Sequence, residues 1–137
     1  EGIQQISPDR EKGLAYAQGF DKQAWFAELA AFLGNGADDM IALDAKEQKY
    51  AVEKHAERLE RIIEHWDVLT EIMKEEIPTA AFIAALLDKI GCPKTVEAWG
   101  LSSEILPMTF KSTKDIRDKY VLSRLAFDLG ILEEVNP

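Results

Sequence analysis

The chain of 137 residues lacks several features that would point directly to a function. Cys92 is its only cysteine, so no internal disulfide can form, as is usual in the cytoplasm. No apolar run approaches the roughly 18 residues of a membrane-spanning helix. Lys and Arg number 16 against 25 Asp and Glu, and the net charge of −9 disfavours nucleic acid or an anionic membrane as a partner. The composition therefore predicts a soluble, cytoplasmic protein of one domain, residues 1–137.

Histidine is also scarce, and the two histidines are badly placed for a metal site. His55 and His65 lie in one expected helix, where ten residues separate them by about 80° in direction and roughly 15 Å in height. Neither has a second ligand three or four residues away, so no metal pair forms on this helix. We interpret each as a solvated or partner-paired side chain at the edge of an apolar stripe.

Other reactive residue types are present without the arrangement that chemistry requires. Cys92 has no nearby His that would activate it, so we expect a small packing residue. Neighbouring carboxylates on a helix diverge, and we interpret three such pairs as solvated surface: Asp38-Asp39, Glu75-Glu76 and Glu133-Glu134. The sequence contains no glycine-rich phosphate loop, GxSxG or HExxH motif. We therefore assign no catalytic, cofactor-binding or metal-ligating residue.

Helical patterning, in contrast, is plentiful. From Val52 to Ile77 apolar side chains recur at alternating steps of three and four, which indicates one broad apolar face. Asp44 is placed as an N-cap with Glu47 three residues later, and Pro78 cannot continue the backbone ladder. The pattern predicts one long helix over about 44–77, around which the remaining segments fold.

The flanking segments also have helix patterns, and none alternates as a strand would. The expected helices are residues 7–18, 21–33, 79–90, 95–99 and 104–129, the last broken between 112 and 120, with a short helical turn at 37–43. Their expected N-caps are Ser7, Asp21, Thr79 and Ser102 or Ser103, and their terminating glycines are Gly19, Gly34, Gly91, Gly100 and Gly130. Trp25, Trp66 and Trp99 lie on apolar faces and are expected in the core. The sequence predicts an all-α, multi-helix bundle.

One polar segment, residues 114–120, has two interpretations. Lys114 with Asp118, and Asp115 with Lys119, have the i, i+4 spacing that supports a helix. Alternatively, Arg117 and Tyr120 face a cleft and bind an anion. The sequence favours the structural interpretation and leaves the second open.

Five short motifs follow one another in the second half of the chain: Ile77-Pro78, Gly91-Cys92-Pro93-Lys94, Gly100-Leu101-Ser102, Ile116-Arg117-Asp118-Lys119-Tyr120 and Asp128-Leu129-Gly130. In this order and spacing they resemble the C-terminal region of sn-glycerol-1-phosphate dehydrogenases. That family belongs to the superfamily of iron-containing alcohol dehydrogenases, glycerol dehydrogenases and dehydroquinate synthases. The resemblance covers about residues 77–132 and continues more loosely back to Phe20.

The resemblance implies that a dinucleotide-binding domain precedes an all-helical domain, with the active site in the cleft between them. The family reduces dihydroxyacetone phosphate to glycerol 1-phosphate with NADH or NADPH and a divalent metal (nickel, zinc or iron). Its metal ligands are one Asp and two His, at least one of which is followed by Gly. His55 precedes Ala56 and His65 precedes Trp66, so neither is assigned as a ligand.

On this resemblance, the chain is the later part of a two-domain dehydrogenase. The sequence begins at Glu1 rather than Met, which also favours a piece of a longer protein. We expect the chain to form one side of the active-site cleft and to contribute to a possible homo-oligomer. We expect it to have no catalytic activity alone. A free-standing helical interaction module, with an exposed apolar groove for another protein, is the alternative.

Overall fold

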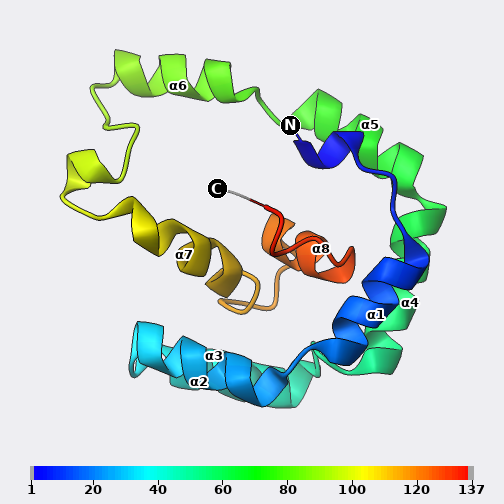
Figure 1. The fold of residues 1–137 in the computed structure, drawn as a ribbon. Helices are drawn as coiled ribbons and strands as arrows, with labels where there is room; N and C mark the ends of the chain where they lie inside the picture. Colours follow the sequence, from blue (N-terminus) through cyan, green and yellow to red (C-terminus); the bar gives the residue numbers. More distant parts are fainter. Residues whose placement is uncertain (1, 136–137) are drawn as a thin grey trace.

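The computed structural model describes residues 2–135, and within that range every regular element is helical. The α-helices are α1 Arg10–Gly19, α2 Lys22–Leu33, α3 Gly36–Glu47, α4 Val52–Glu64, α5 Trp66–Glu76, α6 Ala80–Lys89, α7 Leu106–Ser112 and α8 Leu122–Asp128. Short 3₁₀ helices are η1 Gly2–Gln5, η2 Glu97–Trp99 and η3 Ser103–Ile105. The all-α, multi-helix fold expected from the sequence is confirmed (Figure 1).

The single helix expected over residues 44–77 is wrong, because the chain leaves the helical path twice. Asp44 does not begin a helix. It lies near the end of α3, where its buried carboxylate accepts the Lys49 amide at 2.8 Å and Gln48 turns left-handed at φ 52°. A second break falls at His65, whose φ of −110° and ψ of 17° separate α4 from α5. The apolar stripe begins at Val52 and continues across the break at His65, so its periodicity could not reveal that break.

Most expected caps are confirmed. Asp21 and Thr79 accept amides of their first turns, and Ser102 caps η3. The glycines at 34, 91, 100 and 130 all have positive φ, as helix-terminating glycines do. Three expectations need correction. Gly19 does not terminate α1 with a positive φ; it is the last residue of the helix, and Phe20 is the C-cap. Asp9 rather than Ser7 caps α1, by accepting the Lys12 amide at 3.0 Å. The turn expected at 37–43 is part of the full helix α3.

The core consists of two apolar clusters. The larger joins α4 to α8 and the chain after it: Leu59, Ile62, Leu125, Ala126, Phe127, Leu129, Ile131 and Leu132. The smaller joins α2 to α3: Trp25, Leu29, Ala37 and Met40. Helix α1 packs closely on α4 and α8, and Gly13 allows this approach. A Cβ added at Gly13 would lie 2.7 Å from Leu59 Cδ2 and 2.8 Å from the Asp128 carbonyl oxygen.

Helix α6 lies apart from this core (Figure 1) and is absent from the pairs of described helices in substantial contact. Its apolar side chains are largely exposed: Phe82 60%, Ile83 40%, Leu86 45% and Ile90 68%. Trp99, in the segment after α6, is 64% exposed, so its expected place in the core is wrong. Trp25 is buried as expected, and Trp66 is half-buried with Nε1 donating to the Ile6 carbonyl at 2.9 Å. The apolar side chains of α6 and Trp99 are therefore left largely uncovered by the described residues.

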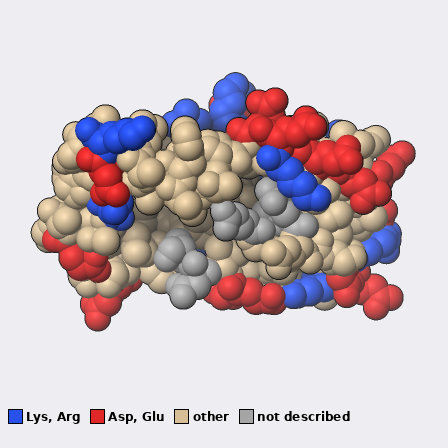
Figure 2. Space-filling view, turned by 90° about the horizontal axis from the view of Figure 1, so that it is seen from above, with Lys and Arg blue, Asp and Glu red and all other residues tan. Residues whose placement is uncertain are grey.

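Charged side chains are unevenly distributed. On the face shown in Figure 2, Asp and Glu gather along the edges, whereas uncharged side chains surround a hollow.

Among the described residues, no helix is both long and apolar enough to cross a membrane.

Candidate functional site

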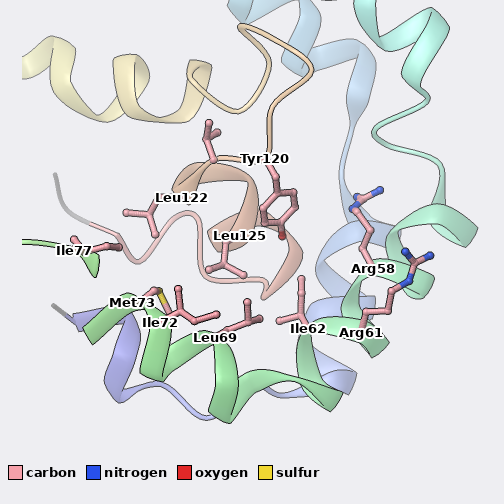
Figure 3. A pocket seen from close by; sticks show the side chains of 11 residues that line it. Arg58, Arg61, Ile62, Leu69, Ile72, Met73, Ile77, Tyr120, Leu122 and Leu125 are labelled. Atoms are coloured by element: carbon pink, nitrogen blue, oxygen red, sulfur yellow. The ribbon is translucent and has the colours of Figure 1, made fainter. Parts of the chain in front are cut away.

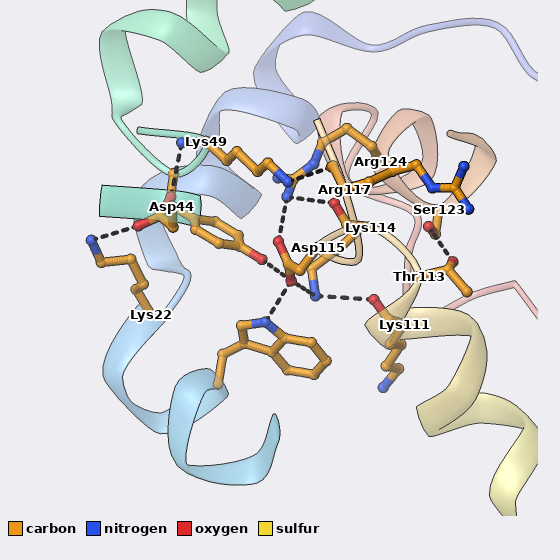
Figure 4. A network of polar contacts seen from close by, with 12 residues as sticks. Lys22, Asp44, Lys49, Lys111, Thr113, Lys114, Asp115, Arg117, Ser123 and Arg124 are labelled. Carbon is orange, nitrogen blue, oxygen red and sulfur yellow. Dashed lines mark hydrogen bonds and ion pairs between the residues drawn. The ribbon is translucent and has the colours of Figure 1, made fainter. Parts of the chain in front are cut away.

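The segment between α7 and α8, residues 113–121, crosses the polar interior of the molecule (Figure 4). It is not helical, so the i, i+4 pairs expected within it do not form. The expected helix support by Lys114 with Asp118, and by Asp115 with Lys119, is therefore wrong. Lys114 and Asp115 turn inward instead, and their side chains are 0% and 2% exposed.

Asp115 is the first of two buried carboxylates that organise this region. Its Oδ2 accepts Trp25 Nε1 at 2.9 Å and the Tyr50 hydroxyl at 2.6 Å. Its Oδ1 accepts Arg124 Nη2 at 2.9 Å, and Lys114 Nζ lies 3.3 Å from Oδ2. Four donors from α2, the α3–α4 connection, the 113–121 segment and α8 thus meet at one buried negative charge, which offsets the cost of burying two cations.

Lys114 is a buried cation among aromatic rings. Its Nζ lies 3.2 Å from the centroid of the Trp25 ring and donates to the Lys111 carbonyl at 3.2 Å. Burial lowers the pKa of Lys114 to about 7, although the Asp115 carboxylate opposes this shift. The ammonium therefore titrates near neutral pH.

Asp128, the second carboxylate, is fully buried in α8. Arg58 donates to it from Nε and Nη2, both at 3.0 Å, and the Tyr120 hydroxyl donates at 2.8 Å. Burial alone would lower the pKa of Arg58, but its hydrogen bonds to Asp128 raise it. Burial of the phenol and the Asp128 charge both raise the pKa of Tyr120. Tyr120 and Arg58 are therefore held in fixed positions on either side of one carboxylate.

His55 lies beside this pair and is only 1% exposed, so of the two interpretations of this histidine the structure supports the partner-paired one. Its Nε2 lies 3.1 Å from the Asp128 carbonyl oxygen, which can only accept, so Nε2 carries the proton. Burial lowers the pKa of His55 and keeps the ring neutral. Its Nδ1 has no partner among the described residues, yet Arg58 and Arg124 are close enough to disfavour a cation there.

These residues do not fit the divalent metal that the family resemblance implies. His65 is exposed at the break between α4 and α5, far from the environment of His55. Within residues 2–135, no three side chains of His, Cys, Asp or Glu gather so as to hold a metal ion.

A polar cleft of about 170 Å³ opens over the buried network. Its cationic lining comes from α4, α8 and the connections that precede them: Lys49, Arg58, Lys114, Lys119 and Arg124. Glu47, Asp118 and Tyr120 complete the lining. Tyr120 thus faces a cleft, as one interpretation of the sequence held. Arg117 is exposed and does not line this cleft, although its carbonyl accepts Lys49 Nζ at 2.8 Å.

An apolar groove of about 460 Å³ adjoins the polar cleft, and Arg58 and Tyr120 line both. Figure 3 shows Leu69, Ile72 and Met73 of α5 facing Leu122 and Leu125 of α8 across it. Arg58 and Arg61 lie at one end of the groove (Figure 3). The groove is an apolar surface that the described residues leave open to solvent.

Sequence reasoning missed the centres of this network. Arg124 and Asp128 lie four residues apart in helix α8, whose other residues are apolar except Ser123, and this spacing of charges was the available signal. Asp115 carried no such signal, because two of its four partners, Trp25 and Tyr50, lie 90 and 65 residues away in the sequence. Comparison of the chain with protein-family models, curated proteins and solved structures finds no match.

Proposed function

We propose that this chain is the C-terminal helical domain of an NAD(P)- and metal-dependent oxidoreductase similar to sn-glycerol-1-phosphate dehydrogenase. In this proposal the parent enzyme reduces dihydroxyacetone phosphate, and the chain walls the cleft while the preceding domain supplies the cofactor and metal sites. The proposal rests on the ordered motifs in residues 77–132 and on one structural observation, the uncovered apolar stripe of α6.

Helix α6 is too short to be stable by itself, so its apolar stripe must pack against another surface. It has 10 residues, and isolated helices shorter than about 12–15 residues are marginal in water. Most helical stability in proteins comes from packing an apolar face, yet Phe82, Ile83, Leu86 and Ile90 pack on little within the described chain. A covering surface from outside these residues would bury that stripe together with the groove beside α5.

The occupant we propose is the dinucleotide-binding domain of the same polypeptide. The family resemblance places that domain before the helical one, with the active site between them. The polar cleft would then lie near the boundary of the two domains, since Arg58 and Tyr120 line both it and the apolar groove.

The first test reads the coding sequence upstream of Glu1. Glycine-rich turns, an Asp ligand and a His followed by Gly would support the dehydrogenase. A start codon immediately upstream would instead support the free-standing interaction module.

The second test measures NADH oxidation by the intact protein with dihydroxyacetone phosphate and a divalent metal. We expect activity, and none from residues 1–137 alone. Leu86→Glu places a charge in the centre of the α6 stripe and should lower activity about tenfold or more, because an interface disfavours an unpaired charge. Ala81→Glu, on the opposite face of α6, adds the same charge and should have little effect. Activity of the isolated chain, or equal effects of the two variants, would contradict the proposal.

A further inference from the structure

The apolar groove between α5 and α8 gives an incoming molecule almost nothing to hydrogen-bond along its length. Apart from Tyr120 and two arginines, its lining is apolar and non-aromatic: Ile62, Leu69, Ile72, Met73, Ile77, Val121, Leu122 and Leu125. The hydroxyl of Tyr120 already donates to Asp128. Ile72 and Leu122 face each other across the groove (Figure 3) and are each 51% exposed, so the described chain leaves this surface uncovered.

The apolar lining limits the chemistry that can enter the groove. A sugar or an extended peptide would exchange hydrogen bonds with water for apolar contacts, whereas a saturated hydrocarbon chain has no hydrogen bonds to lose. Aromatic ligands gain from stacking on other rings, and Tyr120 is the one aromatic residue of the described lining. The groove volume of about 460 Å³ lies within the roughly 300–1,000 Å³ that is usual for small-molecule sites. The groove therefore fits an aliphatic chain.

The two arginines at one end of the groove differ in how firmly they are held (Figure 3). Arg58 donates from Nε and Nη2 to the buried carboxylate of Asp128, so its charge is already compensated. Arg61 Nη2 lies 3.6 Å from Glu57 Oε2, which is too far for a hydrogen bond, and the two side chains are 71% and 70% exposed. Exposed pairs of this kind contribute little, so another carboxylate can replace Glu57 at Arg61.

One available guanidinium limits the charge of the ligand's head group. A monoanion matches the charge of Arg61, whereas a dianion would leave one negative charge unmatched near Glu57 and Asp128. A carboxylate suits this position, because it can accept two parallel N–H bonds from one guanidinium.

We infer that the groove binds a medium-chain aliphatic carboxylate, whose hydrocarbon chain lies between α5 and α8 and whose head group accepts N–H bonds from Arg61. This site does not depend on the proposed oxidoreductase role, because it uses only residues of this chain. A domain that covered the groove would enclose the ligand, and small-molecule sites are common at such domain interfaces.

Calorimetry tests this binding by titrating the 137-residue chain with decanoate, kept below the concentration at which it forms micelles. Decanol has the same chain without the charge, and decyltrimethylammonium has the opposite charge. We expect one decanoate per chain, an affinity about three- to tenfold lower for decanol, and a still lower one for the cation, by the usual worth of one charged contact. In NMR spectra the methyl signals of Ile72 and Leu122 should shift with decanoate, and those of Leu33 in α2 should not.

Two surface variants test the head group. Arg61→Gln should weaken decanoate binding about three- to tenfold and leave decanol binding within about twofold. Glu57→Gln removes the competing carboxylate and should tighten decanoate binding about twofold. The matched control is Arg117→Gln, which removes an exposed arginine that does not line the groove and should change neither affinity by more than about twofold. All three side chains are exposed, so the variants should fold as the parent chain does.

A second matched pair tests the position of the hydrocarbon chain. Ile72 and Val68 both belong to α5 and are 51% and 55% exposed, but only Ile72 lines the groove. Ile72→Glu places a charge against the ligand's chain and should weaken both decanoate and decanol about tenfold or more, whereas Val68→Glu should leave both within about twofold.

Sedimentation velocity distinguishes a small ligand from a second copy of the chain as the occupant. A dimer that Ile72→Glu dissociates and decanoate does not would assign the groove to a second copy and overturn the proposal. The proposal is also overturned if decanoate does not bind, if decanol binds as tightly, or if Arg61→Gln and Arg117→Gln have equal effects. None of these measurements uses an enzymatic activity, so their outcome is separate from the test of the oxidoreductase.

Discussion

Replacing Asp115 by Asn changes the shape of the side chain very little and removes one buried negative charge. The carboxylate accepts from Trp25, Tyr50 and Arg124, and Lys114 Nζ lies 3.3 Å away. An amide at this position places an NH₂ group opposite one or more of these donors. It also leaves two buried cations without their counter-charge.

The expected cost follows from these contacts. Removing one partner of a buried ion pair destabilises proteins by about 3–5 kcal/mol. For a chain of this length, 1 kcal/mol corresponds to roughly 3–4 °C in Tm, so Asp115→Asn should lower Tm by about 9–20 °C. Such a loss is a large part of the roughly 5–15 kcal/mol that stabilises a typical domain.

Circular dichroism at 222 nm during urea and thermal unfolding measures this loss. The matched control is Asp118→Asn, three residues away, whose carboxylate is 59% exposed and lies 3.9 Å from Lys119 Nζ. An exposed pair contributes little, so the control should stay within about 1 kcal/mol of the parent chain. If Asp115→Asn does not fold, adding Lys114→Met removes one uncompensated cation and should restore part of the stability. A loss no larger than that of Asp118→Asn would refute the buried-charge argument.

Two further predictions concern protonation and packing. Burial lowers the folded-state pKa of Lys114 to about 7 from 10.5, so the unfolded chain binds more protons above pH 7, and stability should rise with pH from about 7 toward 10 at up to about 1.4 kcal/mol per unit. Urea unfolding at several pH values measures this slope, which Lys114→Met should abolish; an unchanged slope would contradict the assignment. Gly13→Ala places a Cβ 2.8 Å from the Asp128 carbonyl oxygen and should cost about 1–3 kcal/mol in thermal unfolding. Gly19→Ala, in the same helix with nothing within 4 Å, should be neutral or slightly stabilising, and equal effects would show that α1 tolerates a wider spacing.

Local sequence signals predicted most of the helices because their causes are local. Asp21 and Thr79 cap their own first turns, and Gly91 and Gly130 supply the positive φ at which helices end. These interactions span only a few residues, so the order of side chains is enough to predict them. The expected break between Ser112 and Tyr120 is also confirmed, since residues 113–121 are not helical.

The long helix over 44–77 was mispredicted because its interruptions depend on partners elsewhere. Asp44 has the residue type of an N-cap, but it is buried and pairs with Lys22 while it accepts the Lys49 amide. Likewise, the i, i+4 spacing of Lys114 and Asp118 supports a helix only if the backbone is helical there. Asp115 instead accepts donors that lie 65 and 90 residues away in the sequence.

The sequence by itself determined the helical class, most helix ends and the apolar stripes that need cover, because propensity, capping and periodicity are properties of neighbouring residues. Only the tertiary structure decided that Lys114, Asp115, Arg124 and Asp128 turn inward, and that α6 remains uncovered within the described chain. Those outcomes depend on the free energy of burying charges against distant partners, which no short stretch of sequence specifies.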